Sequence, residues 1–133
     1  MTDAPLWGVF HVWMDGTTPA KYKFFICLHV SGESAVGLVI NSGINELGQG
    51  EALRPCYAPV RQDGHPFLSR DSWADCTRTF TVPIEALSER RGTLTPEAAR
   101  AVREAVQVCP RLKPRTRSVL LAVPVQEDGE GEA

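Results

Sequence analysis

The sequence lacks most of the features that would assign it to a specialised class of protein. Its net charge is only −2 over 133 residues, so a nucleic-acid site would have to depend on a local cluster of lysine and arginine. No hydrophobic run approaches the roughly 20 residues that cross a bilayer, and residues 1–6 lack the pattern of a signal peptide. We therefore expect a cytoplasmic protein without membrane contact.

Cysteine pairs at metal-binding spacing are also absent. Cys27, Cys56, Cys76 and Cys109 lie far apart in the sequence, with no Cys-x-x-Cys pair. This spacing matches neither a zinc finger nor a disulfide framework, so free thiols are expected, whether buried, exposed or reactive. The spacing of Cys56, His65 and Cys76 does not favour a zinc site either. We expect no metal and no cofactor.

The composition is that of an ordinary globular protein. Hydrophobic residues make up 43% of the chain and charged residues 23%. The length is sufficient for one hydrophobic core, so we predict a single domain over residues 1–125. Residues 126–133 are acidic and glycine-rich, which predicts a disordered tail.

Aromatic and β-branched residues dominate the first part of the chain and predict strands. The segment 53–61 contains Pro55 and Pro59, so it can form at best an edge strand. The stretch 42–51 holds three glycines and predicts a long loop. The strands expected with regular pairing are residues 7–13, 21–30, 35–41 and 73–82.

Helical patterns appear only in the last third. A short helix is expected over residues 83–87. Thr95 is a good N-cap for the best helix, residues 96–109, which has Pro96 at its first position. Residues from Pro114 predict another short helix, with a strand as the alternative. Strands first and helices last predict an α+β domain built on a small antiparallel barrel.

The order of elements and two short motifs together resemble the MazF/PemK-like family of type II toxin–antitoxin toxins. Residues 68–75 match a Leu…Ser-aromatic-x-Asp motif that begins a strand. Residues 92–97, Gly-Thr-Leu-Thr-Pro-Glu, match the break before the last helix. The resemblance covers about residues 7–122 and implies a small antiparallel SH3-like β-barrel with C-terminal helices.

The resemblance also implies an activity. Toxins of this family are metal-independent endoribonucleases that cleave single-stranded mRNA by attack of the ribose 2′-hydroxyl on the adjacent phosphorus. This reaction needs a base, an acid and a cation for the charge that develops on the phosphorane. The catalytic residues implied here are Asp75 as base, Arg78 at the phosphate, and Ser72 and Ser42 as hydrogen-bond donors.

Binding residues and partners follow from the same resemblance. The side chains expected to contact the substrate are Asn41, Lys23, His65 and Arg70, with Arg70 as a second candidate for the phosphate. The partners implied are single-stranded RNA, a second copy of the chain in a homodimer, and an antitoxin peptide lying across the groove.

Two departures from the family pattern keep other functions open. The family's Arg-Pro pair at the start of the second strand is replaced by Tyr22-Lys23-Phe24, and its Pro-x-Thr by residues 39–42. The alternatives are a non-catalytic module for protein or peptide interaction on the same barrel, and a single-stranded nucleic-acid binder that does not cleave.

Several candidate residues also have a purely structural interpretation. Asp71 and Ser72 are typical of a turn before a strand, and Asp75 with Arg78 could be a surface ion pair. His65 precedes a proline and could simply belong to a loop. The one concentrated basic cluster, Arg111, Lys113, Arg115 and Arg117, is either a solvated helix face or a site for an acidic partner.

Overall fold

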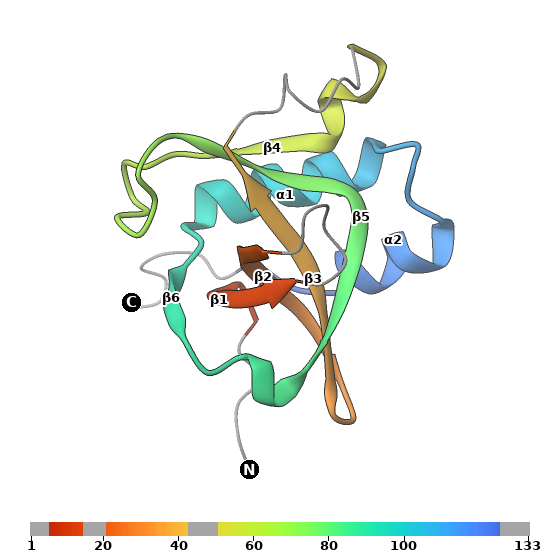
Figure 1. Cartoon of the computed structure of the whole chain (residues 1–133). Coiled ribbons are helices and arrows are strands. Elements are labelled where there is room, and N and C mark those ends of the chain that lie inside the picture. The colour runs from red at the N-terminus through yellow and green to blue at the C-terminus, as the bar shows by residue number, and fades with distance from the viewer. Residues whose placement is uncertain (1–5, 15–20, 43–50, 126–133) are drawn as a thin grey trace, which may run out of the picture.

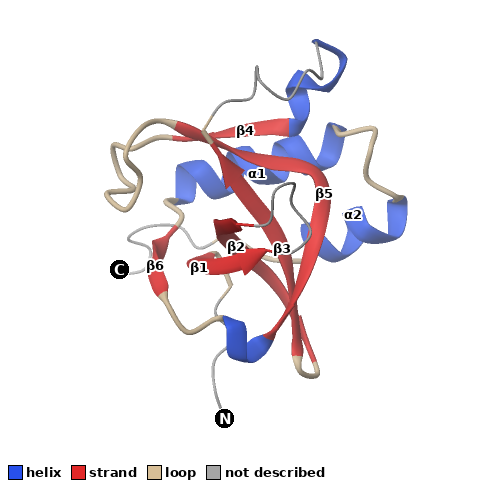
Figure 2. Cartoon of the chain, in the orientation of Figure 1, coloured by secondary structure: helices blue, strands red, loops and turns tan. Residues whose placement is uncertain are grey.

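The computed structural model describes residues 6–14, 21–42 and 51–125, apart from the side chains of residues 51 and 52. Six strands form one antiparallel sheet with the order β4-β5-β3-β2-β1-β6, and helices cover one side of it (Figures 1 and 2). The strands are β1 (Gly8–Met14), β2 (Lys21–Ser31), β3 (Ser34–Asn41), β4 (Tyr57–Val60), β5 (Ser72–Pro83) and β6 (Arg90–Thr93). The helices are α1 (Pro96–Val108) and α2 (Pro114–Leu121), with 3₁₀ turns η2 (Glu51–Cys56) and η3 (Ile84–Ala86).

The α+β class is confirmed, whereas a closed barrel is not. β4 and β6 are the two edges of the sheet, and no pairing joins them in the described part of the chain. The sheet is instead strongly curled, because the β2–β3 pairing and the β3–β5 pairing both shift register around Gly37. A Cβ atom at Gly37 would lie 1.8 Å from the Ile26 carbonyl oxygen, so only glycine permits this approach.

Curling gives the sheet two separate cores. The larger core lies between the sheet and the helices and contains Ile26 and Leu38 with Val102 and Val106 of α1. The smaller core lies on the opposite face, around Phe25, and η3 and the residues after it close it. Both faces of the middle of β2 are therefore buried, which explains the continuous apolar run at residues 25–28, whereas the first and last residues of β2 are exposed.

Most predicted elements are found at the expected places. β4 is an edge strand that contains Pro59, as predicted, but it is shorter than the expected segment 53–61, because residues 53–56 with Pro55 belong to η2. The helix expected over 83–87 is only the single 3₁₀ turn η3. β6 was not predicted: its sequence is Arg-Arg-Gly-Thr, and only pairing with β1 makes it a strand. Of the loop expected over residues 42–51, residue 51 begins η2, whereas residues 43–50 lie outside the described residues, as does the expected tail at 126–133.

The N-terminus of α1 forms as its sequence predicts. Thr95 has an extended backbone, and its hydroxyl accepts a hydrogen bond from the Ala98 amide at 3.1 Å. Pro96 occupies the first turn, where its missing N–H has no intrahelical partner to lose. None of the described helices is long and apolar enough to span a membrane.

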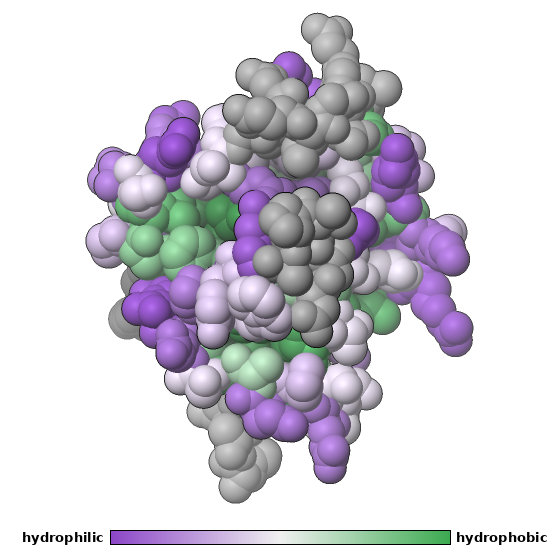
Figure 3. Space-filling view, in the orientation of Figure 1, coloured by the Kyte–Doolittle hydropathy of each residue, from purple (hydrophilic) through white to green (hydrophobic). Residues whose placement is uncertain are grey.

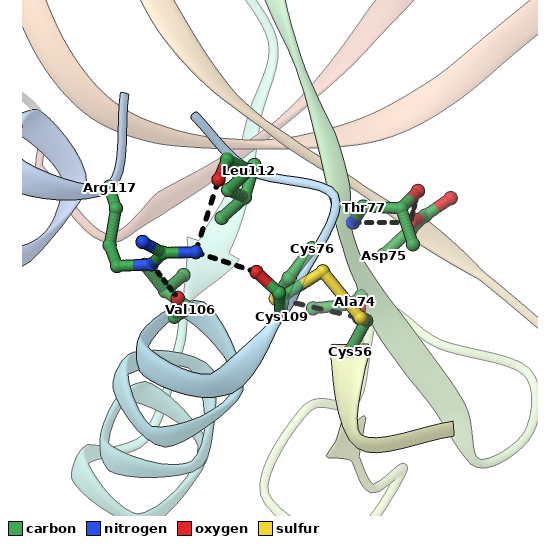
Figure 4. The surroundings of a disulfide bond; sticks show 9 residues. All are labelled: Cys56, Ala74, Asp75, Cys76, Thr77, Val106, Cys109, Leu112 and Arg117. Atoms are coloured by element: carbon green, nitrogen blue, oxygen red, sulfur yellow. Dashed lines mark hydrogen bonds between the residues drawn. A yellow bond between two sulfur atoms is a disulfide. The ribbon is translucent and has the colours of Figure 1, made fainter. Parts of the chain in front are cut away.

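Residue Arg117 belongs to the basic cluster, yet it is a structural residue. Residues 114–121 are a helix, which excludes the strand alternative. From α2, the guanidinium donates to the carbonyls of Val106, Cys109 and Leu112 at 3.1, 2.7 and 3.0 Å (Figure 4). These include carbonyls at the end of α1 that the helix itself leaves unpaired.

Arg103 makes the reciprocal contact from α1. Its guanidinium donates to the carbonyls of Leu121 and Val123, at 2.8 and 2.6 Å, where α2 ends. Each helix therefore supplies the arginine that satisfies the C-terminus of the other. A charge placed at a helix C-terminus also interacts favourably with the helix dipole.

The expectation of free thiols was wrong for two of the four cysteines. Cys56 and Cys109 form a disulfide that ties η2 to the C-terminus of α1 (Figure 4). Cys27 and Cys76 are free and buried, and burial raises the pKa of the Cys27 thiol to about 11. The spacing of Cys56 and Cys109 gave no sign of the disulfide, because packing of α1 against β4 brings them together.

The disulfide yields a stability prediction. It closes a loop of 53 residues, so the chain-entropy model gives a contribution of roughly 4 kcal/mol to the free energy of unfolding. Reduction by dithiothreitol is expected to lower the urea midpoint of the wild-type protein. The double variant Cys56→Ser/Cys109→Ser should unfold at the same lower midpoint with and without dithiothreitol. An unchanged wild-type midpoint would contradict a contribution from this disulfide.

Candidate functional site

A pocket of about 260 Å³ opens where three strands converge. The beginning of β2, the end of β3 and the beginning of β5 form its walls, together with the loop that precedes β5. Because β2 and β3 pair antiparallel, and β3 and β5 do so too, these three strand ends lie side by side. The lining residues are Lys21, Tyr22, Lys23, Phe24, Ile40, Ser42, Leu68, Ser69, Arg70 and Ser72.

The described residues of this lining carry positive charge and no negative charge. The lining offers three cationic side chains from two separate segments of the chain, which are Lys21, Lys23 and Arg70. Three serine hydroxyls and a tyrosine hydroxyl add hydrogen-bond donors, and the remaining residues are apolar. No carboxylate or imidazole is among the described residues that line it. The pocket can therefore bind an anion, although the whole chain is slightly acidic.

Lys23 is the most constrained of the three cations. Its ammonium group donates a hydrogen bond to the side-chain oxygen of Asn41 on the neighbouring strand. The pKa of Lys23 is lowered, first by burial and then by the charge of Lys21, whereas Asp75 acts in the opposite direction. Two predicted binding residues, Lys23 and Asn41, are thus brought together, and Lys23 is held where it loses its proton more readily.

The serines and Arg70 come from the end of β3 and the beginning of β5. Ser72 is buried, and its hydroxyl donates to the Arg70 carbonyl at 3.0 Å. Asp71 accepts the Gln62 amide at 2.8 Å, so this segment also has the turn-forming role that its sequence suggested. Ser42 is exposed and lies in the same pocket as Ser72 and Arg70.

Asp75 is not among the residues that line this pocket. It pairs with Val39 of the smaller core, whereas its neighbours Ala74 and Cys76 face the helices. Its carboxylate accepts the Thr77 amide and hydroxyl at 2.9 and 2.5 Å (Figure 4). The charge of Asp75 nevertheless acts on Lys23, whose pKa it raises. Asp75 is thus close enough to influence the site electrostatically without lining it.

Arg78 lies further along β5, beyond the register shift. It is exposed, and its guanidinium carbon lies 4.4 Å from the centre of the Phe80 ring. It does not line the pocket that contains Ser42 and Ser72. The predicted catalytic set is therefore split: two serines line one pocket, Asp75 lies outside the lining but acts on Lys23, and Arg78 lies outside the lining as well.

His65 is a structural link between two loops. The ring is almost completely buried, with Nδ1 2.6 Å from the Arg61 carbonyl and Nε2 accepting the Thr95 amide at 3.1 Å. Since a carbonyl can only accept, Nδ1 carries the proton and Nε2 does not. This tautomer is neutral, and both nitrogens are engaged, so His65 anchors the beginning of α1.

Sequence reasoning missed two residues at the mouth of the pocket, Lys21 and Tyr22. Their signal was present: the beginning of β2 reads Lys-Tyr-Lys, a polar rim before a buried strand. A second pocket, of about 250 Å³, lies at the N-terminus of α1 beside His65. It contains the carboxylates of Asp63 and Glu97, which makes it less suited to a phosphate.

The link through His65 can be tested by substitution. His65→Ala leaves a buried amide and a buried carbonyl without partners, so we expect about 3 kcal/mol less stability in urea unfolding. Asp63→Ala, an exposed change two residues away, should cost less than about 0.5 kcal/mol. If His65→Ala unfolds at the wild-type midpoint, the two hydrogen bonds do not anchor α1.

Comparison with known proteins finds solved structures that share this fold. No family model matches the sequence, and no curated protein is significantly similar to it. A solved structure of an Mtb toxin matches with a TM-score of 0.53 and 18% identity, covering 74% of this chain and 96% of the toxin. The Mycobacterium tuberculosis toxin MazF-mt6 matches with a TM-score of 0.52 and 19% identity, covering 75% and 96%. The resemblance seen in the sequence is thus confirmed in three dimensions, and the chain has the fold of the MazF toxins.

Proposed function

We propose that this chain is a toxin-like, metal-independent endoribonuclease that cleaves single-stranded RNA. The observation that supports the proposal is the pocket at the ends of β2, β3 and β5, in which three cations and several hydroxyls gather on a MazF-like fold. A phosphodiester is the anion that this combination of charge and hydrogen-bond donors suits best.

In the proposed reaction, the ribose 2′-oxygen forms a bond to the adjacent phosphorus and the bond from phosphorus to the 5′-oxygen breaks. The products are a 2′,3′-cyclic phosphate and a 5′-hydroxyl, whose proton comes from water. Lys23 and Arg70 neutralise the charge of the phosphorane, while the Ser42 hydroxyl donates a hydrogen bond to one of its oxygens. Ser72 can donate a second one only by releasing its hydrogen bond to the Arg70 carbonyl. Since the described lining offers no carboxylate or imidazole, the proton of the 2′-hydroxyl passes to water. Asp75 does not line the pocket, but its charge raises the pKa of Lys23 and so favours the protonated ammonium. Asp75 is therefore a positioning residue in this scheme.

Charge-removing variants test the assignment. Lys23→Met and Arg70→Met should each lower kcat/KM on a fluorogenic single-stranded RNA by about 100-fold or more, with EDTA present throughout. Arg115→Met removes one exposed positive charge on α2 and should leave the rate unchanged. Arg78→Met should behave like this control, because Arg78 lies outside the pocket. Wild-type rates in Lys23→Met would exclude the proposed site.

The pH dependence separates a cationic role of Lys23 from a role as base. Burial and Lys21 lower the pKa of Lys23 below the ordinary value of 10.5. If protonated Lys23 is the active form, cleavage should decline on the alkaline side as pH rises through that lowered pKa. Lys23→Arg keeps the positive charge and should move this decline to higher pH. Cleavage that rises with pH over the same interval would assign Lys23 as base instead.

A second candidate function is a non-catalytic interaction module. The absence of a carboxylate or imidazole from the described lining favours it, because most acid–base catalysts use one of these groups. Its signature would be intact RNA with the wild-type protein, together with full binding of the partner by the Asp75→Ala/Arg78→Ala variant.

We also propose the partners and setting that go with a toxin of this kind. These are a homodimer, an antitoxin peptide as inhibitor, and the cytoplasm as the working compartment, with the curled sheet acting as an opened SH3-like barrel. A cytoplasmic location is compatible with the disulfide only if reduction is slow. Both cysteines are fully buried, which restricts access by an attacking thiolate.

A further inference from the structure

Aromatic side chains form a continuous row across β1 and β2, and two of them, Tyr22 and Phe24, also line the pocket. His11 and Tyr22 are stacked, with ring centres 4.7 Å apart and an interplanar angle of 17°. Trp13 meets Tyr22 edge-on at 5.1 Å, and His11 meets Phe24 at 5.5 Å. Phe24 in turn contacts Phe67 at 5.3 Å. Pairing of β1 with β2 sets this row, because Trp13 lies opposite Tyr22 and His11 opposite Phe24.

The outer end of the row is unusually exposed. Trp13 is 51% exposed and Tyr22 57%, and the only other large hydrophobic residue so exposed in the described chain is Val108. Cross-strand aromatic pairs do stabilise hairpins, but that role does not require two adjacent rings to stay in solvent. Figure 3 shows that, on one face of the molecule, hydrophobic areas lie between hydrophilic ones. The row differs because it is built from stacked rings.

Two rings of the row also belong to the lining of the pocket. Tyr22 and Phe24 line it together with Lys21, Lys23 and Arg70. A surface that passes from exposed rings to clustered cations offers stacking for bases and charge for phosphates. These are the two components of sequence-tolerant binding to single strands.

We propose that Trp13 and Tyr22 form a stacking platform for the nucleobases next to the phosphate held by Lys21, Lys23 and Arg70. The inference rests on the proposed function and adds how the substrate is held. Charge argues against the main competing occupant, a second copy of this surface. Symmetric pairing would bring the three cations of each copy toward those of the other, without a carboxylate among the described pocket residues to offset them.

The test measures binding separately from cleavage. The probe is a short single-stranded RNA that carries 2′-O-methyl groups and so cannot be cleaved, compared with an abasic strand that keeps the same phosphates. Wild-type protein should bind the abasic strand about 10-fold more weakly, which reports the share of bases in the affinity. The base-containing strand should also quench the fluorescence of Trp13, and Trp13→Phe should lose that quenching.

Variants locate the effect on the row. Trp13→Ala and Tyr22→Ala should each weaken binding of the base-containing strand by about 10-fold and leave the abasic strand unaffected. Tyr22→Phe keeps the ring and should retain the difference in affinity between the base-containing and the abasic strand, whereas Val108→Ala is the control for loss of an exposed apolar side chain. Circular dichroism checks that each variant is folded, and Tyr22→Leu replaces Tyr22→Ala if the latter is not.

The outcomes distinguish this proposal from the proposed function. Base-dependent binding without cleavage of ordinary RNA would support the platform and overturn the nuclease. Cleavage with unchanged affinity in Trp13→Ala and Tyr22→Ala would retain the nuclease and overturn the platform. Dissociation of a dimer in those variants, with no difference between the two strands, would assign the row to a protein interface and overturn the platform as well.

Discussion

The close approach of β3 to β2 at Gly37 is the constraint on which the rest of the structure depends. No side chain fits there, since a Cβ would overlap the Ile26 carbonyl. Both pairings of β3 shift register around this point, and a strand with such irregularities bends. The bend curls the sheet, gives it two cores, and brings the ends of β2, β3 and β5 together around one pocket.

Hydrogen bonds from charged or polar side chains and one disulfide hold the helices in place. Arg103 and Arg117 exchange contacts between the C-termini of α1 and α2, and the disulfide joins α1 to η2. At the other end of α1, His65 bonds to the Thr95 amide. These residues could have been taken for functional ones, because cations, thiols and imidazoles are also the groups that catalyse. Because these groups are engaged in structure, they are not candidates for catalysis.

The candidate site was only partly predictable. The sequence indicated Lys23, Asn41, Ser42, Arg70 and Ser72, and the structure brings these residues to one pocket or its immediate wall. Asp75 and Arg78 follow closely in the sequence, yet β5 alternates its faces and shifts register after Asp75, so they do not join the pocket. Ser72 and Asp75 belong to one motif, yet only Ser72 lines the pocket. The other lining residues come from the ends of different strands that pair in the sheet.

Local patterns in the sequence determined the main strands, the edge position of β4 and the cap of α1, because hydrophobic periodicity, proline and threonine act over a few residues. Tertiary structure alone decided β6, the Cys56–Cys109 disulfide and the aromatic row. β6 is a strand only because β1 offers it a partner, and the two cysteines meet only because α1 packs on the sheet. The row exists only because the register of β1 against β2 aligns rings that lie 9 to 13 residues apart in the sequence. Such features depend on contacts between distant segments, which local periodicity does not encode.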